Sequence, residues 1–142
     1  MKYIKVIAVS ILFLQGCAMM QVNDDMMNNK FFDYQPVNVD IEGMYSVPIG
    51  PFISTYVINK NGTGINCYLN NGTAILHKLK LYDRSNGKLS MITETGVKSK
   101  IIRDGEGNLV LDSYGNSFVL KPDNNLENSS IACKEKLSTL IY

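Results

Sequence analysis

Glycine turns at nearly regular spacing constrain the fold of this chain more than any other feature of its sequence. Short runs rich in Ile, Val, Leu, Thr and Tyr alternate with turn dipeptides at Asn61-Gly62, Asn71-Gly72, Asn86-Gly87, Thr95-Gly96, Asp104-Gly105 and Tyr114-Gly115. An Asn-Gly or Asp-Gly pair between alternating apolar runs is a strong signal for a β-hairpin. The pattern therefore predicts an antiparallel β-meander.

The runs between these turns predict about eight strands, at residues 43–47, 52–60, 64–70, 74–82, 88–93, 97–103, 108–113 and 117–121. Sequential antiparallel strands with one buried face close most simply into an up-and-down barrel, which also removes exposed sheet edges. We therefore expect an all-β fold of this kind, with a β-sandwich as the alternative.

Alternation along each strand predicts which side chains point into the barrel. The expected inward residues are Phe52, Tyr56, Ile58, Ile65, Cys67, Leu69, Ile75, His77, Leu79, Leu81, Leu89, Met91, Val97, Ile101, Leu109, Leu111, Phe118 and Leu120. Asn66 and most of the lysines are expected outside. Five apolar residues share this outer parity, namely Leu76, Tyr82, Ile92, Ile102 and Val110. Either other parts of the chain cover them, or they contact a partner protein.

The chain after Pro122 predicts a short C-terminal helix, because Ser129-Ser130 can cap the run that extends from Ile131 to Leu137. Residues 140–142 could add a last short strand.

The N-terminus has the layout of a secretory signal peptide. Lys2 and Lys5 precede an apolar run at residues 6–14, which is too short to span a bilayer as a helix. The sequence Leu14-Gln15-Gly16-Cys17 resembles the lipobox of bacterial lipoproteins. The resemblance implies cleavage of residues 1–16, lipid on the Cys17 thiol and attachment to the cell envelope. Ala18 after the cysteine implies the outer membrane, on its periplasmic leaflet or at the cell surface. An ordinary signal peptide with a stray thiol at Cys17 is the alternative.

Residues 17–42 are expected to form the lipidated N-terminus and a flexible tether, and residues 43–142 the barrel domain. The tether is polar and rich in Asn, Asp and Met. Its methionines are expected to lie against lipid headgroups. Its one compact apolar group, Phe31-Phe32-Asp33-Tyr34, is expected to plug an end of the barrel.

The number of cysteines supports the assignment of Cys17 as the lipid attachment residue. Three cysteines are awkward in an oxidising compartment unless one is otherwise occupied, and lipid on Cys17 leaves the pair Cys67 and Cys133. We expect these two to form a disulfide, with two buried free thiols as the alternative.

The near-neutral charge and the lack of a catalytic arrangement in the sequence argue against several classes of function. The chain has 14 Lys and Arg against 13 Asp and Glu, without a basic stretch, so no nucleic-acid partner is expected. It contains a single histidine, His77, in the middle of an apolar strand rather than on a loop beside a nucleophile. No catalytic residues, metal site or cofactor are predicted, and the protein is not expected to be an enzyme. If His77 lines a cavity, then Tyr56, Ser54 and Ser99 are the expected partners in a ligand site.

Gly43-Met44-Tyr45 stands at the first expected strand, before a meander of about eight strands and a C-terminal helix. This layout resembles the calycin and lipocalin-like group, in which a Gly-x-Trp element stands at the first strand. Tyr45 stands where the group has Trp. Two functions are compatible with this layout. The inward list contains almost no Gly or Ala, which favours a filled barrel that acts as an interaction or structural module for an envelope protein partner. The alternative is a carrier or sensor of a small apolar ligand, and a cavity inside the barrel would distinguish the two.

Overall fold

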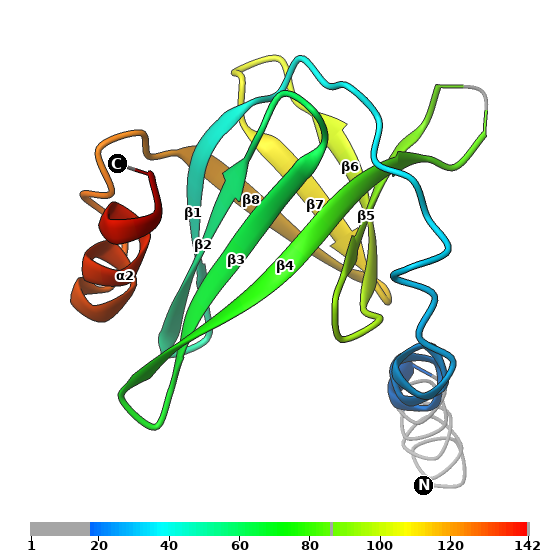
Figure 1. The fold of residues 1–142 in the computed structure, drawn as a ribbon, viewed down its shortest axis with the longest axis horizontal. Coiled ribbons are helices and arrows are strands. Elements are labelled where there is room, and N and C mark those ends of the chain that lie inside the picture. The colour runs from blue at the N-terminus through cyan, green and yellow to red at the C-terminus, as the bar shows by residue number, and fades with distance from the viewer. Residues whose placement is uncertain (1–17, 86, 142) are drawn as a thin grey trace, which may run out of the picture.

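The computed structural model describes residues 18–85 and 87–141 and shows a closed barrel of eight antiparallel strands (Figure 1). The strands are β1 (Gly43–Ile49), β2 (Phe52–Ile58), β3 (Thr63–Asn70), β4 (Thr73–Asp83), β5 (Leu89–Thr93), β6 (Lys98–Arg103), β7 (Leu109–Ser113) and β8 (Asn116–Pro122), and the helix α2 (Ile131–Ile141) follows them. Each strand pairs with the next, and β8 returns to β1. The predicted up-and-down barrel with a C-terminal helix is thereby confirmed.

Two-residue turns set the register of the hairpins. In the β3–β4 turn, Asn71 and Gly72 have φ of 50° and 78°, and in the β7–β8 turn Tyr114 and Gly115 have φ of 50° and 82°. Positive φ at both central positions is the geometry that matches the right-handed twist of paired strands. The Asn-Gly turn is favourable in this conformation, whereas Tyr114 adopts it at some steric cost.

The barrel core differs from the expected one in β3. The buried apolar cluster inside the barrel consists of Ile41, Tyr45, Val47, Tyr56, Ile58, Leu79, Leu81, Met91, Ile101, Leu109, Leu111 and Leu120. Asn66 pairs with Tyr56 on one side and with His77 on the other, so it shares their inward face. The inward assignment of Ile65, Cys67 and Leu69 was therefore wrong. These three residues face outward, where other parts of the chain cover them.

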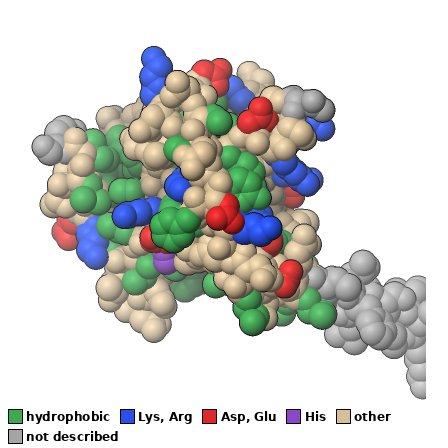
Figure 2. Space-filling model, turned by 45° about the vertical axis from the view of Figure 1, so that its right-hand side comes forward, with side chains coloured by type: hydrophobic (Ala, Val, Ile, Leu, Met, Phe, Trp, Pro, Cys, Tyr) green, Lys and Arg blue, Asp and Glu red, His purple; other side chains and the backbone are tan. Residues whose placement is uncertain are grey.

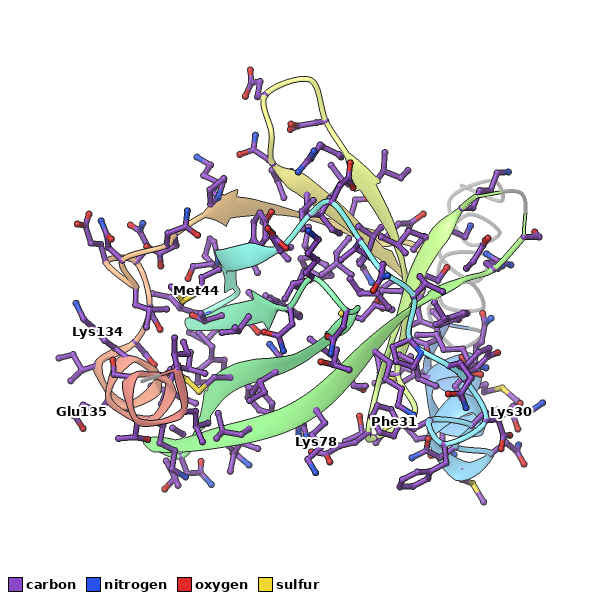
Figure 3. All side chains as sticks on the ribbon, turned by 45° about the horizontal axis from the view of Figure 1, so that its top comes forward. Lys30, Phe31, Met44, Lys78, Lys134 and Glu135 are labelled. Atoms are coloured by element: carbon purple, nitrogen blue, oxygen red, sulfur yellow. A yellow bond between two sulfur atoms is a disulfide. The ribbon has the colours of Figure 1, made fainter. Side chains whose placement is uncertain are left out.

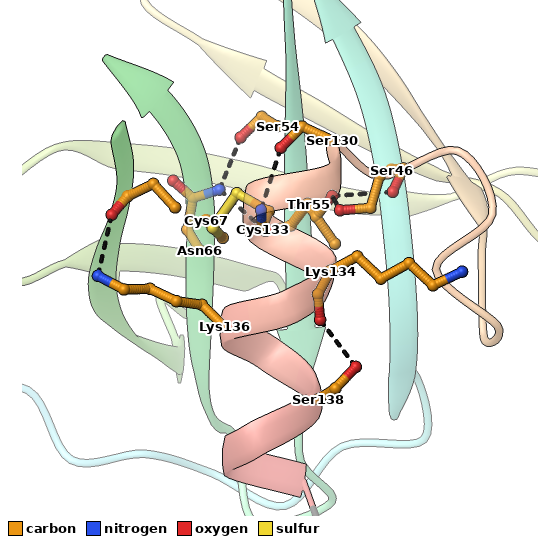
Figure 4. The surroundings of a disulfide bond; sticks show 12 residues. Ser46, Ser54, Thr55, Asn66, Cys67, Ser130, Cys133, Lys134, Lys136 and Ser138 are labelled. Atoms are coloured by element: carbon orange, nitrogen blue, oxygen red, sulfur yellow. Dashed lines mark hydrogen bonds between the residues drawn. A yellow bond between two sulfur atoms is a disulfide. The ribbon is translucent and has the colours of Figure 1, made fainter. Parts of the chain in front are cut away.

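Helix α2 is what covers them. Cys133 and Leu137 of α2 are fully buried and pack with Cys67, Ile65 and Leu69 in a second apolar cluster. The predicted disulfide between Cys67 and Cys133 is present and fixes the helix to β3 (Figure 4). The predicted serine cap is also present, as the Cys133 amide donates to Ser130 Oγ at 3.3 Å. The expectation of a last strand at 140–142 was wrong at residues 140 and 141, which belong to α2.

The N-terminal segment also differs from the flexible tether that its composition suggested. Residues 18–27 are helical, and residues 28–42 run along the outside of the barrel to β1. Lys80 on β4 holds this segment, because its Nζ donates to the carbonyl oxygens of Phe31 and Tyr34 at 3.0 and 3.2 Å. The amide of Val37 donates to the Leu81 carbonyl at 2.9 Å. These contacts could not be predicted from the polar composition of the segment, because most of them use its backbone groups.

The aromatic group of this segment covers the barrel wall rather than an end. Phe31 is buried against Tyr82 and Ile92 on the outer face of β4 and β5, and Figure 3 shows Phe31 between the N-terminal helix and β4. The Tyr34 ring stacks on Tyr82 with 4.0 Å between centroids. Ile41, not Phe31, enters the core from the end of the barrel at which β1 begins. In the part of the chain that the structure describes, no helix is both long and apolar enough to cross a membrane.

Candidate functional site

The barrel contains a cavity of about 340 Å³ at one of its two ends. This end, here called the open end, carries the β1–β2, β3–β4, β5–β6 and β7–β8 turns. Residues in or next to three of these turns, Ile49, Thr95 and Ser113, line the cavity. The other end, here called the closed end, is filled by Ile41, Leu81, Leu109 and neighbouring members of the core cluster. The barrel interior is therefore packed at the closed end and contains a cavity toward the open end.

The wall of the cavity combines an apolar surface with hydroxyl and amide groups. The apolar wall is formed by Met26, Ile49, Met91, Val97, Leu111 and Phe118, and the polar wall by Tyr56, Asn66, Tyr68, His77, Thr93, Thr95, Ser99 and Ser113. Ligand sites commonly have this composition, in which an apolar surface buries the ligand and a few polar groups orient it.

Asn66 is held in place by the neighbouring strand. Its Nδ2 donates to Ser54 Oγ at 2.7 Å and to the Thr55 carbonyl at 3.3 Å. Burial raises the pKa of the Tyr56 phenol above its ordinary value, although the Ser54 hydroxyl offsets part of the shift. Tyr56 is thus a neutral hydroxyl at physiological pH, able to donate or accept a hydrogen bond.

His77 joins the cavity to its rim. Its Nε2 lies 3.0 Å from the Tyr68 hydroxyl, and its Nδ1 lies 3.3 Å from Glu94 Oε1. Glu94 Oε1 also accepts from the Lys78 amide at 3.0 Å. Partners on both ring nitrogens fix the orientation of the imidazole. The His77 side chain remains 22% exposed, so a ligand can reach it.

The structure brings the predicted ligand residues together. Tyr56, His77 and Ser99 line the cavity, and Ser54 lies behind them as the acceptor for Asn66. Sequence reasoning missed Asn66 because it assigned β3 the wrong face, and with Asn66 it missed Tyr68. The two-residue Asn71-Gly72 turn carried the signal, since counting pairs from it places Asn66 opposite His77.

The predicted lipid attachment residue, Cys17, lies outside the described residues. Among those described, no group of three or more His, Cys, Asp or Glu side chains is placed to hold a metal ion.

A second hollow lies outside the barrel, between the N-terminal helix and strands β4 to β7. It measures about 630 Å³ and is lined by charged and phenolic side chains. Lys98 Nζ lies 2.9 Å from Asp25 Oδ1, and the Tyr114 hydroxyl donates to Asp25 Oδ2 at 2.8 Å. These groups satisfy one another, so they serve to hold the helix on the barrel.

Comparison with known proteins places the fold. No protein-family model and no curated protein matches the chain. Among solved structures, the chain is similar to the crystal structure of lipoprotein YedD from Klebsiella pneumoniae subsp. pneumoniae, with a TM-score of 0.60 and 14% sequence identity. The match covers 78% of this chain and 93% of the YedD chain. At this identity the similarity shows a shared fold.

Proposed function

We propose that this protein is a lipid-anchored lipoprotein of the bacterial cell envelope whose barrel binds one small molecule. The observation that carries the proposal is the cavity of about 340 Å³ that reaches His77 inside the barrel. Pockets for small ligands begin at roughly 300 Å³. A barrel with a solely structural role gains nothing from a cavity of this size in its interior.

Two observations support the anchor. The sequence Leu14-Gln15-Gly16-Cys17 follows a charged and then apolar leader. The fold is shared with a protein described as a lipoprotein. Lipid on Cys17, attachment to the outer membrane and loss of residues 1–16 are part of the proposal.

The wall of the cavity indicates the chemistry of the ligand. Its apolar half suits an aliphatic or aromatic body, and its hydroxyl and amide groups suit a hydrogen-bonding group on that body. Lys and Arg do not occur among the lining residues, and His77 is already paired with Glu94. We therefore propose a largely apolar, uncharged ligand.

We further propose a non-enzymatic role. His77 is engaged by Tyr68 and Glu94, and the Ser54 hydroxyl accepts a hydrogen bond from the Asn66 amide, which is not a base that could take its proton. Activation of a nucleophile requires the base to lie within hydrogen-bonding distance of the nucleophile.

Binding of the uncharged fluorescent probe N-phenyl-1-naphthylamine tests the ligand site. Val97 lines the cavity, so Val97→Phe should fill it and weaken probe binding by about tenfold or more, as expected for steric exclusion from an apolar site. Val119→Phe is the matched control, because Val119 lies on the outer face and is 45% exposed. Absence of probe binding to the unaltered protein, or equal binding by the Val97→Phe variant, would overturn the proposal.

The proposed polar contact of His77 with the ligand is tested separately with the substitution His77→Leu. This change keeps the approximate size of the side chain but removes both ring nitrogens. Weaker binding of hydroxylated probes such as naphthols, together with unchanged binding of N-phenyl-1-naphthylamine, would assign His77 to ligand orientation. Unchanged binding of both probe classes would remove His77 from the site.

An interaction module is the second candidate, and one surface favours it. Ile102, Val110 and Val119 lie side by side on the outer face of β6, β7 and β8, because Val110 pairs with both of the others. Ile102 is 60% exposed. Exposed apolar rows of this kind often mark protein contacts. Photo-crosslinking from position 102 in the native host should then give one discrete adduct, and a charge placed in the same row by Val119→Glu should abolish it.

A further inference from the structure

The two ends of the barrel differ sharply in charge. The closed-end turns carry Lys60, Arg84, Lys88, Asp104 and Glu106. The four open-end turns, at residues 50–51, 71–72, 94–97 and 114–115, contain one charged residue, Glu94. In Figure 2 the charged side chains gather over the upper and middle parts of the molecule, and the lower edge is mostly apolar or uncharged. Charged groups are costly to bring into the acyl region of a bilayer and favourable in water, so the two ends suit different surroundings.

The N-terminal helix lies beside the open end (Figure 1). Gly96 of the β5–β6 turn approaches its backbone so closely that a Cβ there would lie 2.5 Å from the Asp25 carbonyl oxygen and 3.2 Å from Met26 Cα. Met26 also lines the cavity. Cys17 precedes this helix directly in sequence. The proposed lipid is therefore attached to the residue before a helix that packs at the open end, and not to a segment at the charged end.

Apolar side chains on the helix and at the open end are exposed. Met19, Met20 and Met27 of the helical region are 79%, 74% and 78% exposed. Phe52, which follows the β1–β2 turn, is 51% exposed. Methionine and phenylalanine side chains at a protein surface are suited to insertion among headgroups and the first acyl carbons.

We propose that the open end of the barrel rests on the membrane surface that holds the lipid of Cys17, so that the cavity faces the bilayer. The inference rests on the anchoring part of the proposed function and adds the partner of this surface, a lipid bilayer. The closed end then faces the aqueous compartment. A largely apolar ligand could move between bilayer and cavity without crossing water.

Glu94 is the charged residue in the open-end turns, and bringing its carboxylate toward lipid costs free energy. Its hydrogen bonds reduce this cost. Its carboxylate accepts from the Lys78 amide and lies 3.3 Å from His77 Nδ1. A carboxylate with hydrogen-bond donors is less costly to bring toward lipid than a free one.

Tryptophan fluorescence tests the orientation, because the chain contains no tryptophan. Phe52→Trp places a single reporter at the open end, and Lys60→Trp places one in the β2–β3 turn of the closed end. The full lipidated protein is inserted into vesicles of phosphatidylethanolamine and phosphatidylglycerol, with and without bromine on the acyl chains. Bromolipid should quench the fluorescence of the Phe52→Trp variant by about twofold or more, as expected for an interfacial residue, and leave that of the Lys60→Trp variant nearly unchanged.

Every result of the quenching experiment either supports or overturns the proposed orientation. Equal quenching at both positions, stronger quenching at position 60 or no quenching at either would overturn the orientation. Failure of the lipidated preparation to float with vesicles would refute the anchor, and with it the proposed location of the protein. Probe binding by the lipid-free protein is independent of both results, so failure of the ligand site and failure of the orientation remain distinguishable.

Discussion

Asp25 of the N-terminal helix and Lys98 of β6 form an ion pair with 2.9 Å between Oδ1 and Nζ. Tyr114 completes the pair by donating to the second Asp25 oxygen at 2.8 Å. Burial opposes ionisation of Asp25, but the hydrogen bonds from Lys98 and Tyr114 outweigh it and lower the pKa of the carboxyl below its ordinary value. The pair fixes the helix that directly follows Cys17 at the open end of the barrel.

Asp25→Asn should loosen this helix without unfolding the barrel. Both partners are partly buried, with side-chain exposures of 18% for Asp25 and 29% for Lys98. Loss of two charge-assisted hydrogen bonds should cost about 1 to 2 kcal/mol, which corresponds to roughly tenfold faster amide exchange in residues 18–27. Hydrogen–deuterium exchange followed by mass spectrometry measures this.

Asp24→Asn is the matched control for that experiment. Asp24 is exposed and accepts from Asn28 within the same segment. Its substitution should leave exchange in residues 18–27 nearly unchanged, and an equal effect of both variants would contradict a specific role for Asp25.

The helix contact should also depend on pH at the acid side. Because the pKa of Asp25 is lower in the folded protein than its ordinary value of 3.8, the ionised carboxylate stabilises the attachment at any pH above that value. The contribution is lost as the pH falls below about 3.8 through the folded pKa. Below this pH, the protection of the amides of residues 18–27 against hydrogen exchange should therefore fall more steeply in the unaltered protein than in the Asp25→Asn variant.

At alkaline pH, Tyr82 and Tyr114 should lose their phenolic protons at a higher pH than a tyrosine with the ordinary pKa of 10.0. Burial is the main cause that raises the pKa of each to about 12, and the Asp25 carboxylate adds to the shift at Tyr114. Since the folded pKa is raised, the stabilisation is complete below pH 10.0 and is lost as the pH rises toward 12. Ultraviolet difference absorbance should show a late phase, and Tyr114→Phe should remove the amplitude of one tyrosine from it. A late phase of unchanged size in that variant would refute the assignment.

Removal of the disulfide should destabilise the whole barrel domain. Cys67 and Cys133 are 66 residues apart and fully buried, so the bond restricts a long loop of the unfolded chain. The double change Cys67→Ala and Cys133→Ala should lower the free energy of unfolding by about 4 kcal/mol in the chain-entropy model. Urea denaturation measures this. Reductant should lower the midpoint of the unaltered protein and leave that of the double variant in place. A midpoint that ignores reductant in both would show that the bond contributes little.

Gly64 of β3 should tolerate no side chain. A Cβ there would meet the Val57 carbonyl oxygen and lie 2.8 Å from Leu79 Cδ1. Gly64→Ala should therefore lower the free energy of unfolding by about 2 kcal/mol or more, because strand β2 and the core must shift. Gly105→Ala is the matched control, since a Cβ at Gly105 meets no atom within 4 Å. It should leave the thermal midpoint unchanged or slightly raised, and equal loss in both variants would contradict the steric argument.

Local patterns determined the strands, the hairpin turns and the cap of α2. A two-residue turn and the alternation beside it act over a few neighbouring residues, so Asn71-Gly72 and the Ser130 cap could be recognised from the sequence. The closed barrel followed from the number of strands, and the pairing of Cys67 with Cys133 from the assignment of Cys17 to lipid.

The tertiary structure alone decided which face of β3 is inside and where the N-terminal segment lies. Alternation shows that a strand has two unlike faces, but it cannot show which one is inside when both are covered. Ile65 and Leu69 pack under α2, and Asn66 turns inward to meet Ser54 and His77. Such contacts join residues far apart in the chain, so only the folded arrangement brings Met26 to the cavity and leaves a cavity at the open end of the barrel.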